Sequence, residues 1–114
     1  MNEKTKREAL LALGMAKRAG RIVCGTPLVC KALSAKTPPA LIIVSAHASD
    51  NTKKRLRDKS NFYGVSLYEL DVGTDEISAA IGGSAQVAAC AICDQGLARL
   101  FLAKAENDLK RNEE

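Results

Sequence analysis

The apolar run ALIIVSA, residues 40–46, constrains the fold more than any other stretch of the sequence. It is β-branched or apolar almost throughout, as in a central strand that is covered on both faces. Helical and strand-like patterns alternate around it, joined by short connections. We expect helices at 4–19, 26–35, 51–61, 74–81 and 95–105, and further strands at 21–24, 65–70 and 86–93. This order predicts a single α/β domain spanning residues 1–114, a three-layer α/β/α sandwich with a four-stranded mixed sheet.

Polar residues and proline locate the ends of these helices. Thr26 is placed to cap the second helix, with Pro27 at its first position, where a missing N–H costs nothing. Asp50 or Asn51 is expected to cap the third. The tail, residues 106–114, is expected to be frayed.

Charge is distributed unevenly along a chain whose formal net charge is +4. Residues 1–36 carry eight Lys or Arg against two Glu, and residues 51–59 carry five against one Asp. Residues 69–76 hold four acidic side chains and no basic one. This segregation predicts one basic face that suits a polyanion such as nucleic acid. Scattered solubilising charge is the alternative.

The chain shows no membrane or secretion signal. Its longest apolar run, residues 40–44, is far too short to cross a bilayer. The first residues lead into a charged helix without the apolar core of a signal peptide. We therefore expect a cytoplasmic protein with no membrane partner.

Four cysteines, at positions 24, 30, 90 and 93, raise the question of a metal or redox site. Cys90 and Cys93 have C-x-x-C spacing, but they lie in an apolar run that is expected to be a strand. Strand alternation sends two such residues to opposite faces. Zinc knuckles hold their cysteines on a tight turn, and redox pairs begin a helix. We expect buried free thiols, with no metal and no cofactor.

Three longer stretches resemble a known family, and together they cover nearly the whole chain. They are GTPLVCKAL, ALIIVSAHASDNTKKRL and QVAACAICDQGLARLF, at residues 25–33, 40–56 and 86–101. In this order they resemble the ribosomal protein L-seven-Ae superfamily. The patterns LGxAxRAG, ASxNTKK and D-x-G-x-A are similar to its small bacterial YlxQ-like branch. The resemblance implies an α/β/α sandwich that binds kink-turn RNA, a sharply bent duplex with a bulge beside tandem sheared G·A pairs.

The resemblance also implies where RNA would bind. In the family, RNA meets the N-terminus of the second helix and the loop before the last strand. On this sequence those positions are Gly25, Thr26, Pro27, Leu28 and Lys31, with Gly83, Ser84, Ala85, Gln86 and Val87 in the loop. Strong kink-turn binders carry Asn-Glu where this chain has Pro27 and Leu28. That difference leaves phosphate binding and a shape-driven fit, but removes the groups that contact the base edges.

Physical reasoning from the residues agrees with this placement. A helix N-terminus carries partial positive charge and unpaired N–H groups, which attract phosphate. Gly25 has no Cβ, so an RNA backbone can approach closely, and Lys31 can supply a mobile charge. Lys17, Arg18 and Arg21 could flank the same edge. The glycine-bearing loop could pack against a base turned out of the bulge.

Two other classes of function need to be weighed. The segment 25–31 lacks the second glycine and the Ser or Thr of a nucleotide phosphate loop, and no G-x-G-x-x-G is present. His47 is the sole histidine, typical of a surface or capping residue, so we expect no enzymatic activity. The rival is a protein-interaction module that has lost RNA binding, with Pro27 and Leu28 forming an apolar patch with Val29 or Ala32.

The expected partner is therefore structured RNA, above all ribosomal RNA, with the ribosome as a further candidate and no specific preference for DNA. The resemblance implies an accessory role in translation, and we expect a monomer. The basic helix 51–61 is either a further RNA contact or simply a solvated face.

Overall fold

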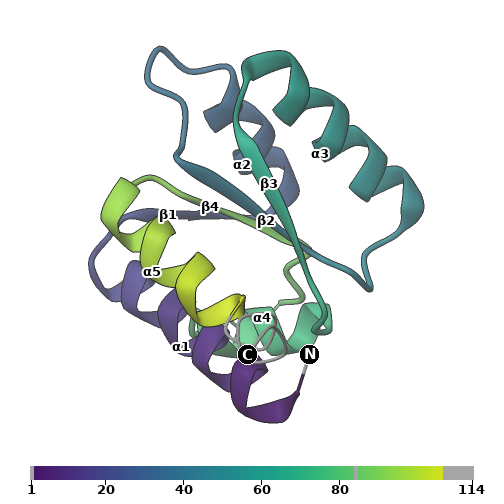
Figure 1. Cartoon of the computed structure of the whole chain (residues 1–114). Coiled ribbons are helices and arrows are strands. Elements are labelled where there is room, and N and C mark those ends of the chain that lie inside the picture. The colour runs from purple at the N-terminus through teal and green to yellow at the C-terminus, as the bar shows by residue number, and fades with distance from the viewer. Residues whose placement is uncertain (1, 84, 107–114) are drawn as a thin grey trace.

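The computed structural model describes residues 2–83 and 85–106 (Figure 1). Helices and strands alternate along this part of the chain, as expected. The helices are α1 Glu3–Arg18, α2 Thr26–Leu33, α3 Asp50–Tyr63, α4 Thr74–Ala80 and α5 Gln95–Ala105. The strands are β1 Ile22–Cys24, β2 Leu41–Ser45, β3 Ser66–Leu70 and β4 Ala89–Ile92.

The four strands form one mixed sheet in the order β1-β4-β2-β3. β4 runs antiparallel to both β1 and β2, whereas β3 runs parallel to β2. All five residues of β2 are buried, which confirms the central, doubly covered strand predicted from the apolar run. β1 and β3 form the two edges of the sheet.

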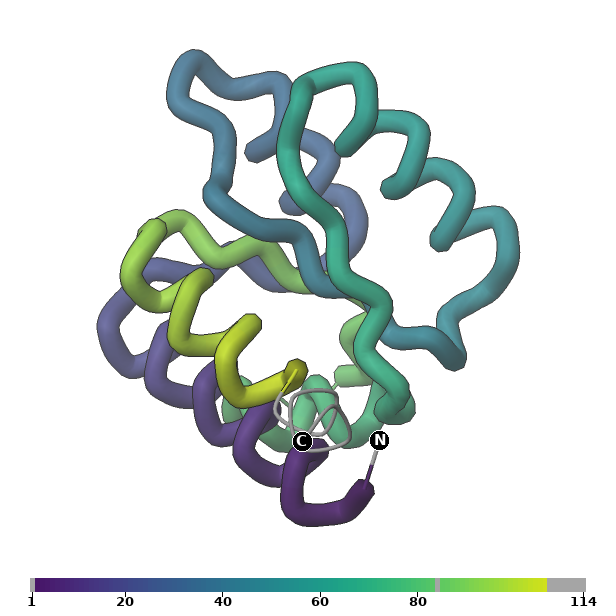
Figure 2. The backbone as a smooth tube through the Cα atoms, viewed as in Figure 1, coloured from purple at the N-terminus to yellow at the C-terminus, as the bar shows by residue number. Residues whose placement is uncertain are grey.

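Helices cover both faces of the sheet (Figure 1). α1, α4 and α5 pack on one face against side chains such as Ile43 and Cys90. α2 and α3 pack on the other, over Ile42 and Ala91. α1 and α5 lie side by side although they come from opposite ends of the described chain (Figure 2). The predicted three-layer α/β/α sandwich is therefore confirmed.

The structure corrects two of the predicted caps. Gly25, not Thr26, is the N-cap of α2, so Pro27 occupies the second helical position. The reason is that Gly25 still donates its N–H to the sheet and the helix begins directly after it. Neither Asp50 nor Asn51 caps α3: the Ser49 hydroxyl, one residue earlier, accepts the Thr52 N–H at 3.2 Å.

Most other boundaries differ from the expectation by one to three residues, whereas α5 has the expected bounds. β4 is shorter than the predicted strand 86–93, because residues 86–88 belong to the loop before it. Glu106 closes α5 with an N–H bond to the Leu102 carbonyl at 2.9 Å. The remainder of the expected frayed tail, residues 107–114, lies outside the described residues. Within 2–83 and 85–106, no helix is both long and apolar enough to cross a lipid bilayer.

Candidate nucleic-acid interface

Gly25 shapes the start of α2. Its N–H donates to the Ala89 carbonyl of β4 at 2.9 Å, while its own carbonyl accepts the Val29 N–H at 2.9 Å. One residue thus ends the sheet pairing and begins the helix, which requires a φ of +97° that side chains rarely tolerate. No atom lies within 4 Å of where a Cβ would stand. The space above Gly25 is therefore open to a ligand.

The first turn of α2 leaves its positive end uncompensated. No side chain caps the helix, and its first turn contains no acidic residue. The N–H groups of Thr26 and Leu28 lie where a helix offers no carbonyl partner, and Pro27 has no N–H. All these features favour an anion at this position.

The exposed face of α2 adds a cation and an apolar side chain. Pro27, Leu28 and Lys31 are exposed, and spacings of three and four residues place them on one side of the helix. Leu28 is 55% exposed, while Val29 is fully buried in the core below α2. Val29 therefore does not contribute to the apolar patch considered for a protein-interaction module.

The loop between α4 and β4 is tied to the start and end of α4. Gly83 donates its N–H to the Ser78 carbonyl at 2.9 Å, and the Ser78 hydroxyl donates to the Ala85 carbonyl. The Thr74 hydroxyl donates to the Gln86 amide oxygen at 3.1 Å. These bonds hold an exposed segment in place at Gly83, Ala85 and Gln86, with Val87 half-buried. Ser84 lies outside the described residues.

The register of the sheet brings this loop to the start of α2. Gly25 is bonded to Ala89, and the loop ends immediately before that residue. The Ala88 carbonyl accepts a hydrogen bond from the Ser45 N–H at 2.8 Å, which places the last residue of β2 at the same end of the sheet. The two regions singled out in the sequence, 52 or more residues apart, therefore meet at one end of the sheet.

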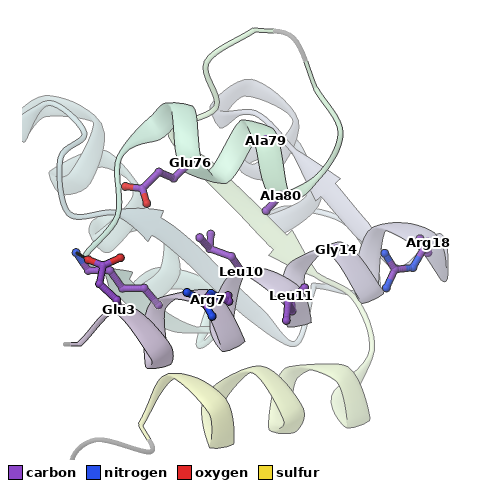
Figure 3. Close-up of a pocket in the computed structure, with 10 residues that line it drawn as sticks. Glu3, Arg7, Leu10, Leu11, Gly14, Arg18, Glu76, Ala79 and Ala80 are labelled. Atoms are coloured by element: carbon purple, nitrogen blue, oxygen red, sulfur yellow. Dashed lines mark ion pairs between the residues drawn. The ribbon is translucent and has the colours of Figure 1, made fainter.

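The three cations expected to flank the start of α2 lie in three different places. Lys17, in the last turn of α1, lies close enough to Cys24 to lower the pKa of its thiol. Arg18 borders a groove of about 530 Å³ between α1 and α4 (Figure 3). Arg21 donates its guanidinium N–H to the Cys93 carbonyl at 3.3 Å. It stands at the opposite end of β1, about 13 Å from Gly25 along extended chain.

Two of the basic side chains on α3 are paired with neighbouring groups. On α3, Arg57 forms an ion pair with Glu69 at 2.8 Å, and the Lys53 ammonium donates to the Ala46 carbonyl at 3.2 Å. Lys54 and Arg55 are exposed. The acidic segment 69–76 lies on β3 and α4, and β3 is the sheet edge opposite β1. The Arg57–Glu69 pair joins this acidic segment to the basic helix α3, so the two charged segments lie next to each other in space.

His47 and the cysteines stand apart from any metal-binding cluster in the described part of the chain. The exposed His47 ring pairs with Asp71 at 3.2 Å. Within residues 2–83 and 85–106, no three His, Cys, Asp or Glu side chains are grouped so that they could hold a metal ion.

The expectation of four buried thiols is wrong for three of them. Only Cys90 is buried, while Cys24, Cys30 and Cys93 are partly exposed. Cys93 follows the end of β4, so the alternation of side chains along a strand, which was assumed to hold from Cys90 to Cys93, does not extend to it. The sequence also missed that Cys24 pairs with Cys90 across β1 and β4, because only the strand register shows it.

Comparison with solved structures agrees with the fold. A protein of unknown function from Bacillus halodurans has a TM-score of 0.78 at 28% identity, covering 87% of this chain and 97% of that one. A 15.5 kDa RNA-binding protein from Giardia lamblia has a TM-score of 0.74 at 17% identity, covering 94% and 89%.

Sequence comparison identifies the family. No protein-family model matches the chain. The RNA-binding protein YlxQ of Enterococcus faecium is 34% identical over 99 residues, 87% of this chain and 92% of the relative. Its namesake from Bacillus subtilis is 33% identical over 90 residues, 79% of this chain and 87% of the relative. With such relatives over most of its length, the chain belongs to the YlxQ family, within the ribosomal protein L-seven-Ae superfamily that its motifs indicated.

Proposed function

We propose that this protein binds structured RNA through the N-terminus of α2 and the loop that precedes β4. Its YlxQ relatives are named RNA-binding proteins. The observation that carries the proposal is the open start of α2, where an uncapped helix end and the space above Gly25 stand beside an exposed loop.

Each part of this surface has a distinct role in the proposed complex. An RNA phosphate accepts the N–H groups of Thr26 and Leu28, where the helix dipole favours negative charge. Lys31 adds a charge-assisted contact to a neighbouring phosphate. The loop residues Gly83, Ala85 and Gln86 pack against an unstacked base.

Pro27 and Leu28 determine what kind of recognition we infer. Neither side chain can hydrogen-bond a base, so the proposed recognition depends on phosphates and on the bend of the RNA instead of G·A base edges. A kink-turn is such a bent RNA. We infer that the target lies in ribosomal RNA and that the protein acts in the cytoplasm as a monomeric, non-enzymatic accessory of translation.

A second candidate function rests on the same helix. Leu28 is 55% exposed beside Pro27, which would suit a small apolar contact with another protein. The two functions differ in salt dependence, because RNA binding weakens steeply with salt while an apolar contact does not.

Lys31→Ala tests the proposal, with Lys104→Ala as the matched control. Lys104 is exposed on α5, against the other face of the sheet, so both variants lose one charge. Titration against a kink-turn RNA and a plain duplex of equal length should show a loss of about 1–3 kcal/mol for Lys31→Ala alone. For Lys31→Ala, the slope of log K against log salt concentration should be smaller in magnitude than for the unsubstituted protein by about 0.7 to 0.9.

The outcomes decide between the candidates. Equal affinities for the two variants, or no salt-dependent binding to either RNA, would contradict the proposal. Binding to a protein partner that is lost in Leu28→Ala and unaffected by salt would favour the interaction module. Crosslinking the protein in cells and sequencing the attached RNA would then identify the target.

A further inference from the structure

Cys24 and Cys90 face each other in the β1–β4 ladder. The next pair along this antiparallel ladder, Gly25 and Ala89, is hydrogen-bonded through the Gly25 N–H. Hydrogen-bonded and non-hydrogen-bonded pairs alternate, so the two cysteines form a non-hydrogen-bonded pair. In such a pair the Cα atoms are about 4.5 Å apart and the side chains come closest.

Both side chains are on the same face of the sheet, in the core below α1. Cys90 belongs to that core and is fully buried, and Cys24 packs against it while remaining partly exposed. One thiol is thus within reach of a small molecule and the other is shielded. This is the arrangement of an attacking and a resolving thiol.

The electrostatics divide the roles in the same way. A hydrogen bond from the Cys90 thiol and, less strongly, the Lys17 ammonium together lower the pKa of Cys24 to about 7, against the opposing effect of burial. The same hydrogen bond and deeper burial raise the pKa of Cys90. At neutral pH, Cys24 therefore supplies the thiolate, the nucleophilic form, and Cys90 keeps its proton.

We propose that Cys24 and Cys90 form a reversible dithiol site that reacts with low-molecular-weight disulfides of the glutathione type. The Cys24 thiolate attacks one sulfur of the disulfide, forming a mixed disulfide and releasing one thiolate. That thiolate takes the Cys90 proton. The Cys90 sulfur then attacks the Cys24 sulfur, the mixed disulfide breaks, and the second small thiolate leaves and takes from water the proton that Cys24 had released. Two protein thiols are oxidised to one disulfide while one small disulfide is reduced to two thiols.

The geometry favours a disulfide that forms and reopens. A Cα separation of about 4.5 Å lies at the lower end of the range that disulfides span, roughly 4.4 to 6.8 Å. Deviation from the preferred separation stores strain, and strained disulfides are the more easily reduced ones. The site precedes Gly25 directly in the chain, yet the proposal does not depend on RNA binding.

The test uses the full chain with Cys30→Ala and Cys93→Ala, which leaves only the facing pair. Oxidised glutathione at neutral pH should remove the mass of two hydrogens from the folded protein, and a reductant should restore it. Adding Cys90→Ala should trap one glutathionyl group on Cys24. Adding Cys24→Ala instead should give neither product.

A second measurement avoids any effect of substitution on folding. Peptide mapping of the unsubstituted, oxidised protein should find the disulfide between Cys24 and Cys90. The proposal is overturned if the folded protein stays reduced and oxidises only in denaturant, or if glutathionyl groups appear only at Cys30 or Cys93.

Discussion

Two helices in this protein begin with the same dipeptide and present opposite environments to an anion. α2 begins with the sequence GTPL at residues 25–28, and α4 begins with GTDE at residues 73–76. In both, glycine is the N-cap and threonine the first helical residue. The first turn of α4 contains two acidic side chains that offset its positive end, whereas the first turn of α2 contains none and has no side-chain cap.

The backbone explains why the two starts diverge. Gly73 has an ordinary φ of −74°, and its N–H donates to the Glu76 carboxylate at 2.9 Å instead of to a neighbouring strand. Gly25 has a φ of +97°, and its N–H is already bonded to the sheet at Ala89. The carboxylates neutralise the positive end of α4, but no equivalent exists on α2. Strand pairing, not a side chain, thus satisfies the N-cap of α2, and this leaves the start of the helix without an acidic neighbour.

We expect the largest effect, on the free energy of unfolding, from substituting the two N-cap glycines by alanine. Gly25→Ala should lower the free energy of unfolding by about 1–3 kcal/mol more than Gly73→Ala, because alanine is strained at a positive φ. At Gly73 the added Cβ would meet the Asp75 carboxylate oxygen at 2.5 Å, but that side chain can rotate away. Both variants place alanine at an N-cap, so the difference isolates the strain. Urea denaturation measures it.

Equal losses in the two variants would mean that Gly25 is not held at a positive φ in solution. RNA titration of the same pair gives a second comparison. If the proposed interface is correct, Gly25→Ala weakens binding more than Gly73→Ala does.

A smaller effect is expected from removing the third helical side chain of each helix. Glu76→Ala should cost about 1 kcal/mol of stability, since it removes a hydrogen bond and a charge that complements the helix dipole. Leu28→Ala at the corresponding position should change stability by less than about 0.5 kcal/mol, because the side chain is largely exposed. Urea denaturation of both variants checks this, and a large loss in Leu28→Ala would show that Leu28 packs against the fold.

The sequence predicted most of this fold because its helix and strand patterns are strong and locally consistent. The apolar run 40–46 indicated the central strand, and the glycine and proline positions located most turns. What it missed depends on contacts between distant residues. Thr26 looked like a cap, but the bond from Gly25 to Ala89 moved the cap one residue earlier.

The candidate site shows the same limit. The resemblance indicated residues 25–31 and the loop before β4, and the sheet register then brought them to one edge. Arg21 is near Gly25 in sequence but at the other end of a strand, bonded to Cys93. The pairing of Cys24 with Cys90 likewise depends on register, which no local pattern reveals.

We expect the smallest effect, on RNA affinity, from exchanging the types of residue that follow Gly-Thr in the two helices. Pro27→Asn with Leu28→Glu gives α2 the pair typical of strong kink-turn binders. The new carboxylate cannot close the helix as Glu76 does, because the Gly25 N–H is already bonded, so it stays available to RNA. Binding to a plain duplex should weaken by about 0.3–1 kcal/mol, the usual scale of a charge at a helix end. Binding to an RNA with tandem sheared G·A pairs should instead strengthen.

The reverse exchange on α4 is the control for this sign. Asp75→Pro with Glu76→Leu should lower stability and change both affinities by a similar amount, because the start of α4 contacts the loop before β4 through the Thr74–Gln86 hydrogen bond at 3.1 Å but offers no selectivity for sheared pairs. Titration of both double variants against the two RNAs provides the measurement. If the α2 variant weakens binding to both RNAs equally, its start acts only as a positive pole. A gain for the sheared-pair RNA alone shows that the backbone at Gly25 still holds the third helical residue where a kink-turn can be read.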